Sequence, residues 1–218
     1  MIKFVPEGHR YYNDVTGREY LPVSSLLSKY GFIDTSWIDR YVQRTGIDVA
    51  QRGTDIHRTL QLLAIRATQA RHYADDPNYP YIKAGADFLE SWGAHVLATE
   101  LVVHDDKFVP IAGTIDIVAK TLRGDVVIVD WKSGSPTGSH PLQMAAYKDI
   151  LTSTCEQFGF APPARAFTVH VNKHGKFKVC DTFKGISYDS TDFRVAYYSM
   201  LRLEQMRDIL GSTGEVSA

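Results

Sequence analysis

Cysteine is scarce in this sequence. Its 218 residues include only two, Cys155 and Cys180, and neither belongs to a CxxC pair. Two thiols cannot supply the four cysteine ligands of an iron–sulfur cluster or of a cysteine-rich zinc site. The sequence therefore predicts no iron–sulfur cluster. It favours two free buried thiols, as in an intracellular enzyme, over a single disulfide.

Long apolar runs are also missing. No segment approaches the roughly 18 uninterrupted apolar residues that indicate a membrane span. The first ten residues, MIKFVPEGHR, lack the charged-then-apolar order of a secretory signal peptide. We therefore expect no membrane partner and a cytoplasmic location.

Neither sign of charge dominates, since the formal net charge is −1. A protein that coats nucleic acid without specificity is usually strongly basic, although a balanced surface can still carry a local basic groove. Hydrophobic residues make up 44% and charged residues 22%, which is ordinary for a globular protein. A chain of this length can bury one sizeable core, whereas two full domains would be cramped.

Helical spacing of apolar residues dominates the first half of the chain. A turn at 13–17 first joins two short extended segments. Helices are then predicted over 22–30, 36–45, 49–71 and 81–92, and Thr35 is the expected cap of the second. The buried stripe of the third helix is predicted to consist of Ile56, Leu60, Leu63 and Ala67.

Strand patterns follow over 95–103, 109–119 and 125–132, and again over 166–171 and 177–181. The apolar run from Val126 to Val129 is typical of a central strand that is covered on both faces. Helices are predicted over 141–152 and 191–210, and a frayed tail after them. This order predicts an α/β (α+β) fold with a mixed central β-sheet flanked by helices.

The most informative stretch runs from Gly113 to Ser135, GTIDIVAKTLRGDVVIVDWKSGS. It places Asp116 on one strand, and Asp130 and Lys132 at the end of the next. Because side chains alternate along a strand, Asp130 and Lys132 share a face, and the short turn brings Asp116 beside them. Two carboxylates on one face repel each other unless a cation neutralises them, and oxygen ligands suit Mg²⁺ or Mn²⁺.

A surface hairpin with a weak Asp–Lys ion pair is the alternative, and the Asp-x-Lys triplet alone would favour it. The four apolar residues before Asp130 argue for the site instead, because charged groups at the end of a buried strand are typical of active sites.

Four short motifs occur in the order found in one nuclease branch. They are Gly53-Thr54-Asp55-Ile56-His57, Gly113-Thr114-Ile115-Asp116, Asp130-Trp131-Lys132 and Gln143-Met144-Ala145-Ala146-Tyr147. With them the chain resembles the PD-(D/E)xK nuclease superfamily, in its RecB-like exonuclease branch. That branch includes CRISPR-associated RecB-like nucleases and the mitochondrial genome maintenance exonuclease. The earlier run YLPVSSLLSKYG also resembles the entry region of phage and mitochondrial exonucleases.

The resemblance implies a metal site. Asp116 and Asp130 would ligate Mg²⁺ or Mn²⁺, and the main-chain carbonyl of Trp131 would be a further oxygen ligand. His57 would be an additional ligand through one ring nitrogen; the alternative for a lone helical histidine is a hydrogen-bonded or solvated side chain.

The resemblance also implies catalytic roles. Lys132 would be the catalytic lysine. Gln143 and Tyr147, which share one helix face, would contact the DNA phosphate or support the lysine, unless they are only boundary residues of an amphipathic helix. The chain departs from the family pattern at Ile115, where proline is common.

The resemblance implies a restriction-endonuclease-like core within one domain spanning 1–218. Its parts would be an N-terminal hairpin and helical region at 1–48, a nuclease core at 49–182, a C-terminal helix at 183–210 and a flexible tail at 211–218.

The implied activity is hydrolysis of DNA at ends or in single strands, leaving 5′-phosphates, in DNA repair or recombination. A catalytically silent DNA-binding subunit, an RNA or small-phosphoester hydrolase and a site-specific endonuclease remain alternatives. The expected partner is DNA. A homo-oligomer and partner proteins of replication or recombination are compatible with the resemblance.

For other polar and aromatic residues, the sequence favours a structural role over a functional one or does not decide between them. Glu100 is read as a solvated strand end rather than a carboxylate of the site. Core packing is the favoured reading for aromatics that could stack on unpaired bases, and surface charge explains the basic residues as well as phosphate contact does. These are Tyr11, Tyr12, Trp37, Trp92 and Trp131, and Arg52, Arg58, Lys148 and Arg165.

Overall fold

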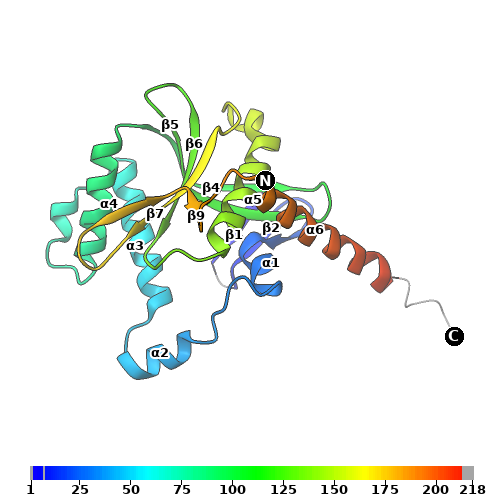
Figure 1. The fold of residues 1–218 in the computed structure, drawn as a ribbon, viewed down its shortest axis with the longest axis horizontal. Helices are drawn as coiled ribbons and strands as arrows, with labels where there is room; N and C mark the ends of the chain where they lie inside the picture. The colour runs from blue at the N-terminus through cyan, green and yellow to red at the C-terminus, as the bar shows by residue number, and fades with distance from the viewer. Residues whose placement is uncertain (1, 7, 213–218) are drawn as a thin grey trace.

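A computed structural model describes residues 2–6 and 8–212 of the chain (Figure 1). A mixed sheet lies at its centre, with α3 (Val49–Ala64) and α4 (Tyr79–Trp92) on one face, and α5 (Ser139–Thr154), α1 (Val23–Lys29) and α6 (Thr191–Ser212) toward the other. This confirms the predicted α/β class with helices flanking a mixed sheet. From residue 213 on, the expected tail lies outside the described residues.

The strand order of the main sheet is β1-β2-β3-β5-β6-β7-β8, and β4 also pairs with β5. The bounds are β1 Ile2–Val5, β2 Arg10–Asn13, β3 Glu19–Pro22, β4 His95–Asp105, β5 Ile111–Lys120, β6 Val126–Lys132, β7 Arg165–Val171 and β8 Phe177–Cys180. Two pairs are parallel, β3 with β5 and β6 with β7, and the others are antiparallel.

One edge of β5 is shared by two strands with a gap between them. β4 pairs with β5 from Ile111 to Lys120 and so occupies one edge throughout. On the other edge, β3 pairs only at residues 111–112 and β6 only at 117–120. Residues 113–116 of β5 therefore face neither β3 nor β6 in the ladder, and this gap becomes the floor of the site described below.

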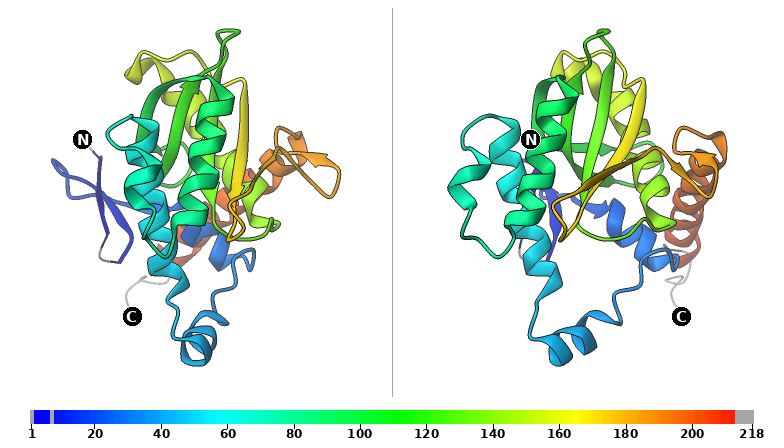
Figure 2. Two further views of the ribbon diagram at one scale, coloured as in Figure 1. Left: turned by 90° about the vertical axis from the view of Figure 1, so that its left-hand side faces the viewer. Right: turned by 60° about the vertical axis from the view of Figure 1, so that its left-hand side comes forward.

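The sheet separates two hydrophobic cores because its strands alternate. Ile117 and Val129 pack with Ile56 and Leu60 of α3, whereas Val118 and Ile128 belong to the core of α1, α5 and α6. Both faces of β6 are thus covered, as its continuous apolar run predicted. Figure 2 shows α3 and α4 together against their face of the sheet.

Helix α3 ends earlier than its sequence pattern predicts. The expected helix 49–71 stops at Ala64, because Arg66 adopts φ +58°, outside the right-handed helical region. Its N–H bonds to the Leu63 carbonyl and that of Ala67 to the Leu62 carbonyl, which closes the helix end. The prediction that Ala67 continues the buried stripe was therefore wrong. A short 3₁₀ helix, η1 (Ala70–Tyr73), follows instead.

The predicted cap at Thr35 was also wrong. Helix α2 (Ile38–Thr45) begins after Trp37 with no side-chain cap, and it has no buried residue. The next helix, α3, does have a side-chain N-cap. Asp48 accepts hydrogen bonds from the N–H groups of Ala50 (3.0 Å) and Gln51 (2.9 Å).

Several short elements were not predicted from the sequence, namely β1, η2 (Cys155–Phe158), β9 (Thr182–Phe183) and β10 (Ile186–Ser187). Cys155 and Cys180 are free and buried, as expected. No helix in the described part of the chain combines the length and the apolar content needed to cross a membrane.

A buried carboxylate fastens α6 to α1. Glu204 accepts hydrogen bonds from the Lys29 ammonium and from the Tyr30 hydroxyl (2.8 Å), and Arg207 Nη1 lies 3.1 Å away. Burial raises the pKa of Glu204, but the bonds from Lys29 and Tyr30 outweigh it, so the pKa lies below its ordinary 4.5.

We expect Glu204→Gln to lower the free energy of unfolding at pH 7 by about 1–3 kcal/mol, the usual effect of losing charge-assisted hydrogen bonds. Because the folded-state pKa is depressed, the contribution is present above the unfolded pKa and is lost as pH falls through the folded one. Urea unfolding at pH 7 and well below pH 4 should therefore show a difference between the two proteins that shrinks in acid. A constant difference would contradict this account.

Candidate active site

A hollow of about 600 Å³ opens at the gap on the edge of β5. The β1–β2 hairpin forms one wall, the first half of α3 forms another, and β4, β5, β6 and α5 supply the polar floor. The floor residues are Glu100, Thr114, Asp116, Asp130, Lys132, Gln143 and Tyr147, and His57 and Arg58 of α3 lie above them.

The two aspartates share one face of the sheet. The β5–β6 register pairs Ile117 with Val129, and extending it by one residue places Asp116 opposite Asp130. Both are buried, with exposed fractions of 8% and 3%. Beyond this point the ladder ends, and the N–H of Trp131 donates instead to Oδ2 of Asp116 at 2.7 Å. The site therefore begins where regular β5–β6 pairing stops.

His57 contacts Asp116, with 3.3 Å between its Nδ1 and the aspartate Oδ2. Burial raises the pKa of Asp116, but the charge of His57 and their contact bring the net pKa below its ordinary value. The same pairing has the opposite effect on His57. Burial lowers its pKa, and the carboxylate more than compensates, so its pKa is raised. The contact with Asp116 thus favours the protonated form of the imidazole.

Lys132 links Asp130 to helix α5. Its Nζ lies 2.5 Å from Oδ2 of Asp130 and donates to Oε1 of Gln143 at 2.9 Å. Gln143 Nε2 in turn donates to the Tyr147 hydroxyl oxygen at 3.0 Å. The tyrosine and glutamine thus hold the lysine in place, and the tyrosine O–H remains available as a donor.

The residues present fit a hard divalent cation. Burial raises the pKa of Asp130 despite Lys132, and its Oδ2 makes no hydrogen bond of regular geometry within the described residues. No three His, Cys, Asp and Glu side chains of the described residues form a ready cluster. Two carboxylates suffice for Mg²⁺, which keeps several waters and takes substrate phosphate oxygens. A role for His57 as a further ligand stays a prediction.

Glu100 joins the site, although its sequence context favoured a solvated strand end. Its side chain is exposed, but into the hollow. Continuing the β4–β5 register through Thr99↔Ile117 and Leu101↔Ile115 places it opposite Asp116. Desolvation by the walls and the charge of Asp116 raise its pKa to about 7, and its backbone has φ +50°. Only the tertiary pairing reveals this neighbour, since nothing in the sequence around Glu100 distinguishes it.

Among the basic residues considered for phosphate contact, Arg58 alone lines the hollow. Lys148 pairs with Asp189 at 2.7 Å and Arg165 with Asp181 at 2.5 Å, while Arg52 lies over the Tyr81 ring. These three therefore have structural partners. Trp131 and Tyr11 are buried, as predicted, whereas the same prediction was wrong for Trp37, which is 45% exposed.

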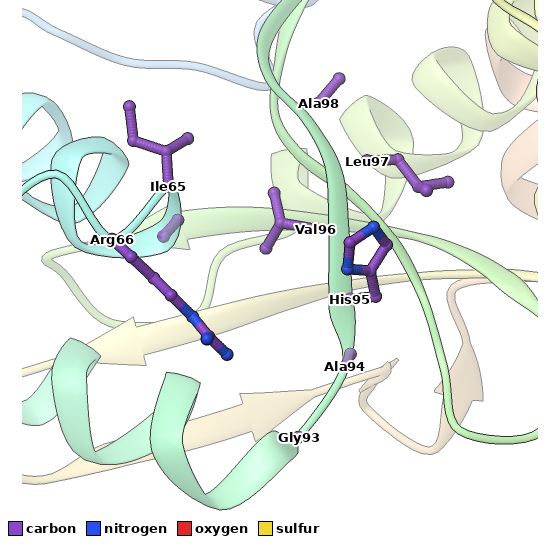
Figure 3. A pocket seen from close by; sticks show the side chains of 9 residues that line it. Ile65, Arg66, Gly93, Ala94, His95, Val96, Leu97 and Ala98 are labelled. Carbon is purple, nitrogen blue, oxygen red and sulfur yellow. The ribbon is translucent and has the colours of Figure 1, made fainter.

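A second hollow, of about 550 Å³, lies between the end of α3 and the start of β4 (Figure 3). Ile65 and Val96 line it, together with Arg66 and His95. It has no carboxylate among its lining residues and therefore none of the acidic chemistry of the first hollow.

The structure gives a reason for the glycine at position 113, the first residue of the motif on β5. A Cβ at this position would lie 2.5 Å from Cε1 of Tyr147, closer than real carbon contacts allow. The tyrosine ring therefore packs directly on the strand backbone. This contact helps to position its hydroxyl beside Gln143.

We expect Gly113→Ala to overpack this contact and to lower the free energy of unfolding by about 1–3 kcal/mol. Gly53→Ala is the matched control, because its Cβ would meet only Ser133 Oγ at 3.9 Å and alanine favours the helix by about 1 kcal/mol. Thermal and urea unfolding measure both. Equal stability of the Gly113→Ala variant and the unmodified protein would show that Tyr147 moves aside freely.

Comparison with known proteins agrees with this geometry. The family model of the PD-(D/E)XK nuclease superfamily matches residues 35–213, while no curated protein matches the sequence. The matched range contains both aspartates, the lysine and the Gln143–Tyr147 pair. Since it covers most of the sequence, the chain belongs to the PD-(D/E)XK nuclease superfamily.

Proposed function

We propose that the chain is a Mg²⁺- or Mn²⁺-dependent deoxyribonuclease of the RecB-like branch, acting as an exonuclease at DNA ends or in single strands. One observation carries the proposal. Two buried carboxylates, Asp116 and Asp130, share one sheet face, and the Lys132 ammonium lies between Asp130 and Gln143. Superfamily membership supports nuclease chemistry. The order of the four motifs supports the branch, and with it a role in DNA repair or recombination.

Asp116 and Asp130 would hold the cation, together with the Trp131 carbonyl and, as a further ligand, His57. Such an ion, when bound, acidifies water and shields the negative charge of the phosphodiester. Binding would also relieve the repulsion between the aspartates, which His57 and Lys132 now balance. Lys132 would then be able to turn from its carboxylate partner toward the substrate.

Lys132 would orient the attacking water and stabilise charge at the phosphate. A bond forms between the water oxygen and phosphorus, and the bond from phosphorus to the 3′-oxygen breaks. The water loses a proton, the 3′-oxygen gains one, and the products are a 5′-phosphate and a 3′-hydroxyl. Gln143 and Tyr147 would hold the lysine, and the free tyrosine O–H is suited to a phosphate oxygen.

We expect Lys132→Ala to reduce degradation of end-labelled linear DNA in Mn²⁺ by roughly 10²- to 10⁴-fold, the range for loss of a proton-transfer or charge-stabilising group. Lys173→Ala is the control, since that lysine is exposed in the turn after β7. Equal activity of the Lys132→Ala variant and the unmodified enzyme would defeat the assignment.

The same assay distinguishes the alternatives. Exonuclease action leaves closed circular DNA intact, whereas an endonuclease cuts it. Preferential cleavage of RNA would replace DNA as the substrate. If the protein binds DNA but degrades none of these substrates, it is a silent binding subunit.

We also expect Asp130→Asn to weaken Mn²⁺ binding by at least about 10-fold, because it removes one of two carboxylate ligands. Titration calorimetry or the manganese electron paramagnetic resonance signal measures this without any substrate. Asp125→Asn, in the distant turn before β6, is a matched control. Unchanged binding would place the ion elsewhere.

A further inference from the structure

Three aromatic rings gather on the β1–β2 hairpin at the wall of the catalytic hollow. Phe4 and Tyr11 are directly paired across the two strands, and their ring centroids lie 4.9 Å apart. The His9 ring lies 5.1 Å from Phe4 and 5.7 Å from Tyr11, edge-on to both. All three line the same hollow as Asp116 and Asp130.

The cluster is fixed to the strand that carries Asp116. The Tyr11 hydroxyl bonds with Oγ1 of Thr114 at 2.9 Å, only two residues before Asp116. Tyr11 is 1% exposed and so serves as an anchor inside the wall. A partly buried hydrogen bond therefore helps to fix the position of the hairpin relative to the carboxylates.

Unlike the buried Tyr11, Phe4 is 36% exposed. A partly exposed aromatic side chain at the wall of the hollow leaves apolar surface in water that a ligand could cover. His9 has φ +50°, a conformation uncommon outside glycine that is often retained at binding sites. Burial lowers the pKa of His9, which favours the neutral ring at pH 7.

The wall formed by α3 carries polar residues. Thr54, Arg58 and Gln61 of α3 face the hollow, and Arg58 has no ion-pair partner within the described residues. The hollow thus combines aromatic rings, a basic side chain and two carboxylates suited to a cation, which matches the parts of a nucleotide: a flat base, a phosphate and a cation bound to it.

We propose that Phe4, with His9 beside it, is a stacking platform for an unpaired nucleobase next to the phosphate held at Asp116 and Asp130. This rests on the proposed function and names its substrate as single-stranded DNA. A base inside a duplex is covered on both faces by its neighbours, so away from the duplex ends it offers no face to a side-chain ring. Every unpaired or extruded base does offer such a face.

Binding of a fluorescent oligothymidylate, measured by anisotropy with Ca²⁺ replacing Mn²⁺ to prevent cleavage, tests the platform. Phe4→Ala should weaken binding by roughly 5- to 100-fold, the range for loss of one base–aromatic stack. Phe4→Trp should retain affinity. Phe32→Ala is the matched control, since Phe32 is 44% exposed but lies outside the hollow.

An abasic strand of the same length completes the test. It should bind the unmodified protein more weakly, and Phe4→Ala should have little effect on that weaker binding, because the base and the ring form one interaction. Phe4→Leu keeps an apolar side chain without a ring and should resemble Phe4→Ala, while circular dichroism checks that each variant is folded.

Two results would overturn the platform: Phe4→Leu binding like the unmodified protein, or Phe4→Ala weakening the abasic strand as much as the normal one. Neither concerns cleavage. If the unmodified enzyme fails to degrade DNA in Mn²⁺, the proposed function fails, and the binding measurements still decide whether the ring stacks on a base.

Discussion

The hydrogen bond from the Trp131 N–H to the Asp116 carboxylate is the contact on which the site depends. It takes the place of a main-chain bond at the point where β6 leaves β5. A buried N–H needs an acceptor, and a buried carboxylate needs donors, so each satisfies the other. Because the ladder ends here, the edge of β5 is left open between β3 and β6, and the hollow forms over that opening.

Charge balance within this opening accounts for the remaining contacts. Two buried acids require compensation, and His57 provides it for Asp116 while Lys132 provides it for Asp130. The lysine is held in turn by Gln143 and Tyr147, and the tyrosine ring packs against Gly113. These contacts connect the four motifs, although they are far apart in the sequence.

Local rules predicted the parts of this arrangement that depend on strand alternation and helical spacing. Asp130 and Lys132 fall on one face because they are two residues apart, and Gln143 and Tyr147 because they are four apart. The structure brings these residues together, while their chemical roles stay predictions. Long-range pairing was beyond such rules. Nothing near Glu100 reveals that β4 places it opposite Asp116, and the four-residue strand containing Phe4 is too short for a period to show. Likewise, no glycine or proline marks the end of α3 at Arg66.

The clamp between Glu204 and Lys29 has a consequence for the order in which the protein can fold. Tyr197, Met200 and Leu201 of α6 complete the same core as Leu26 and Leu27 of α1. Since α6 follows every strand of the sheet, a nascent chain cannot complete this core until α6 has left the ribosome. Until then the apolar side of α1 and α5 remains uncovered, and a chaperone that recognises such surface would find it there.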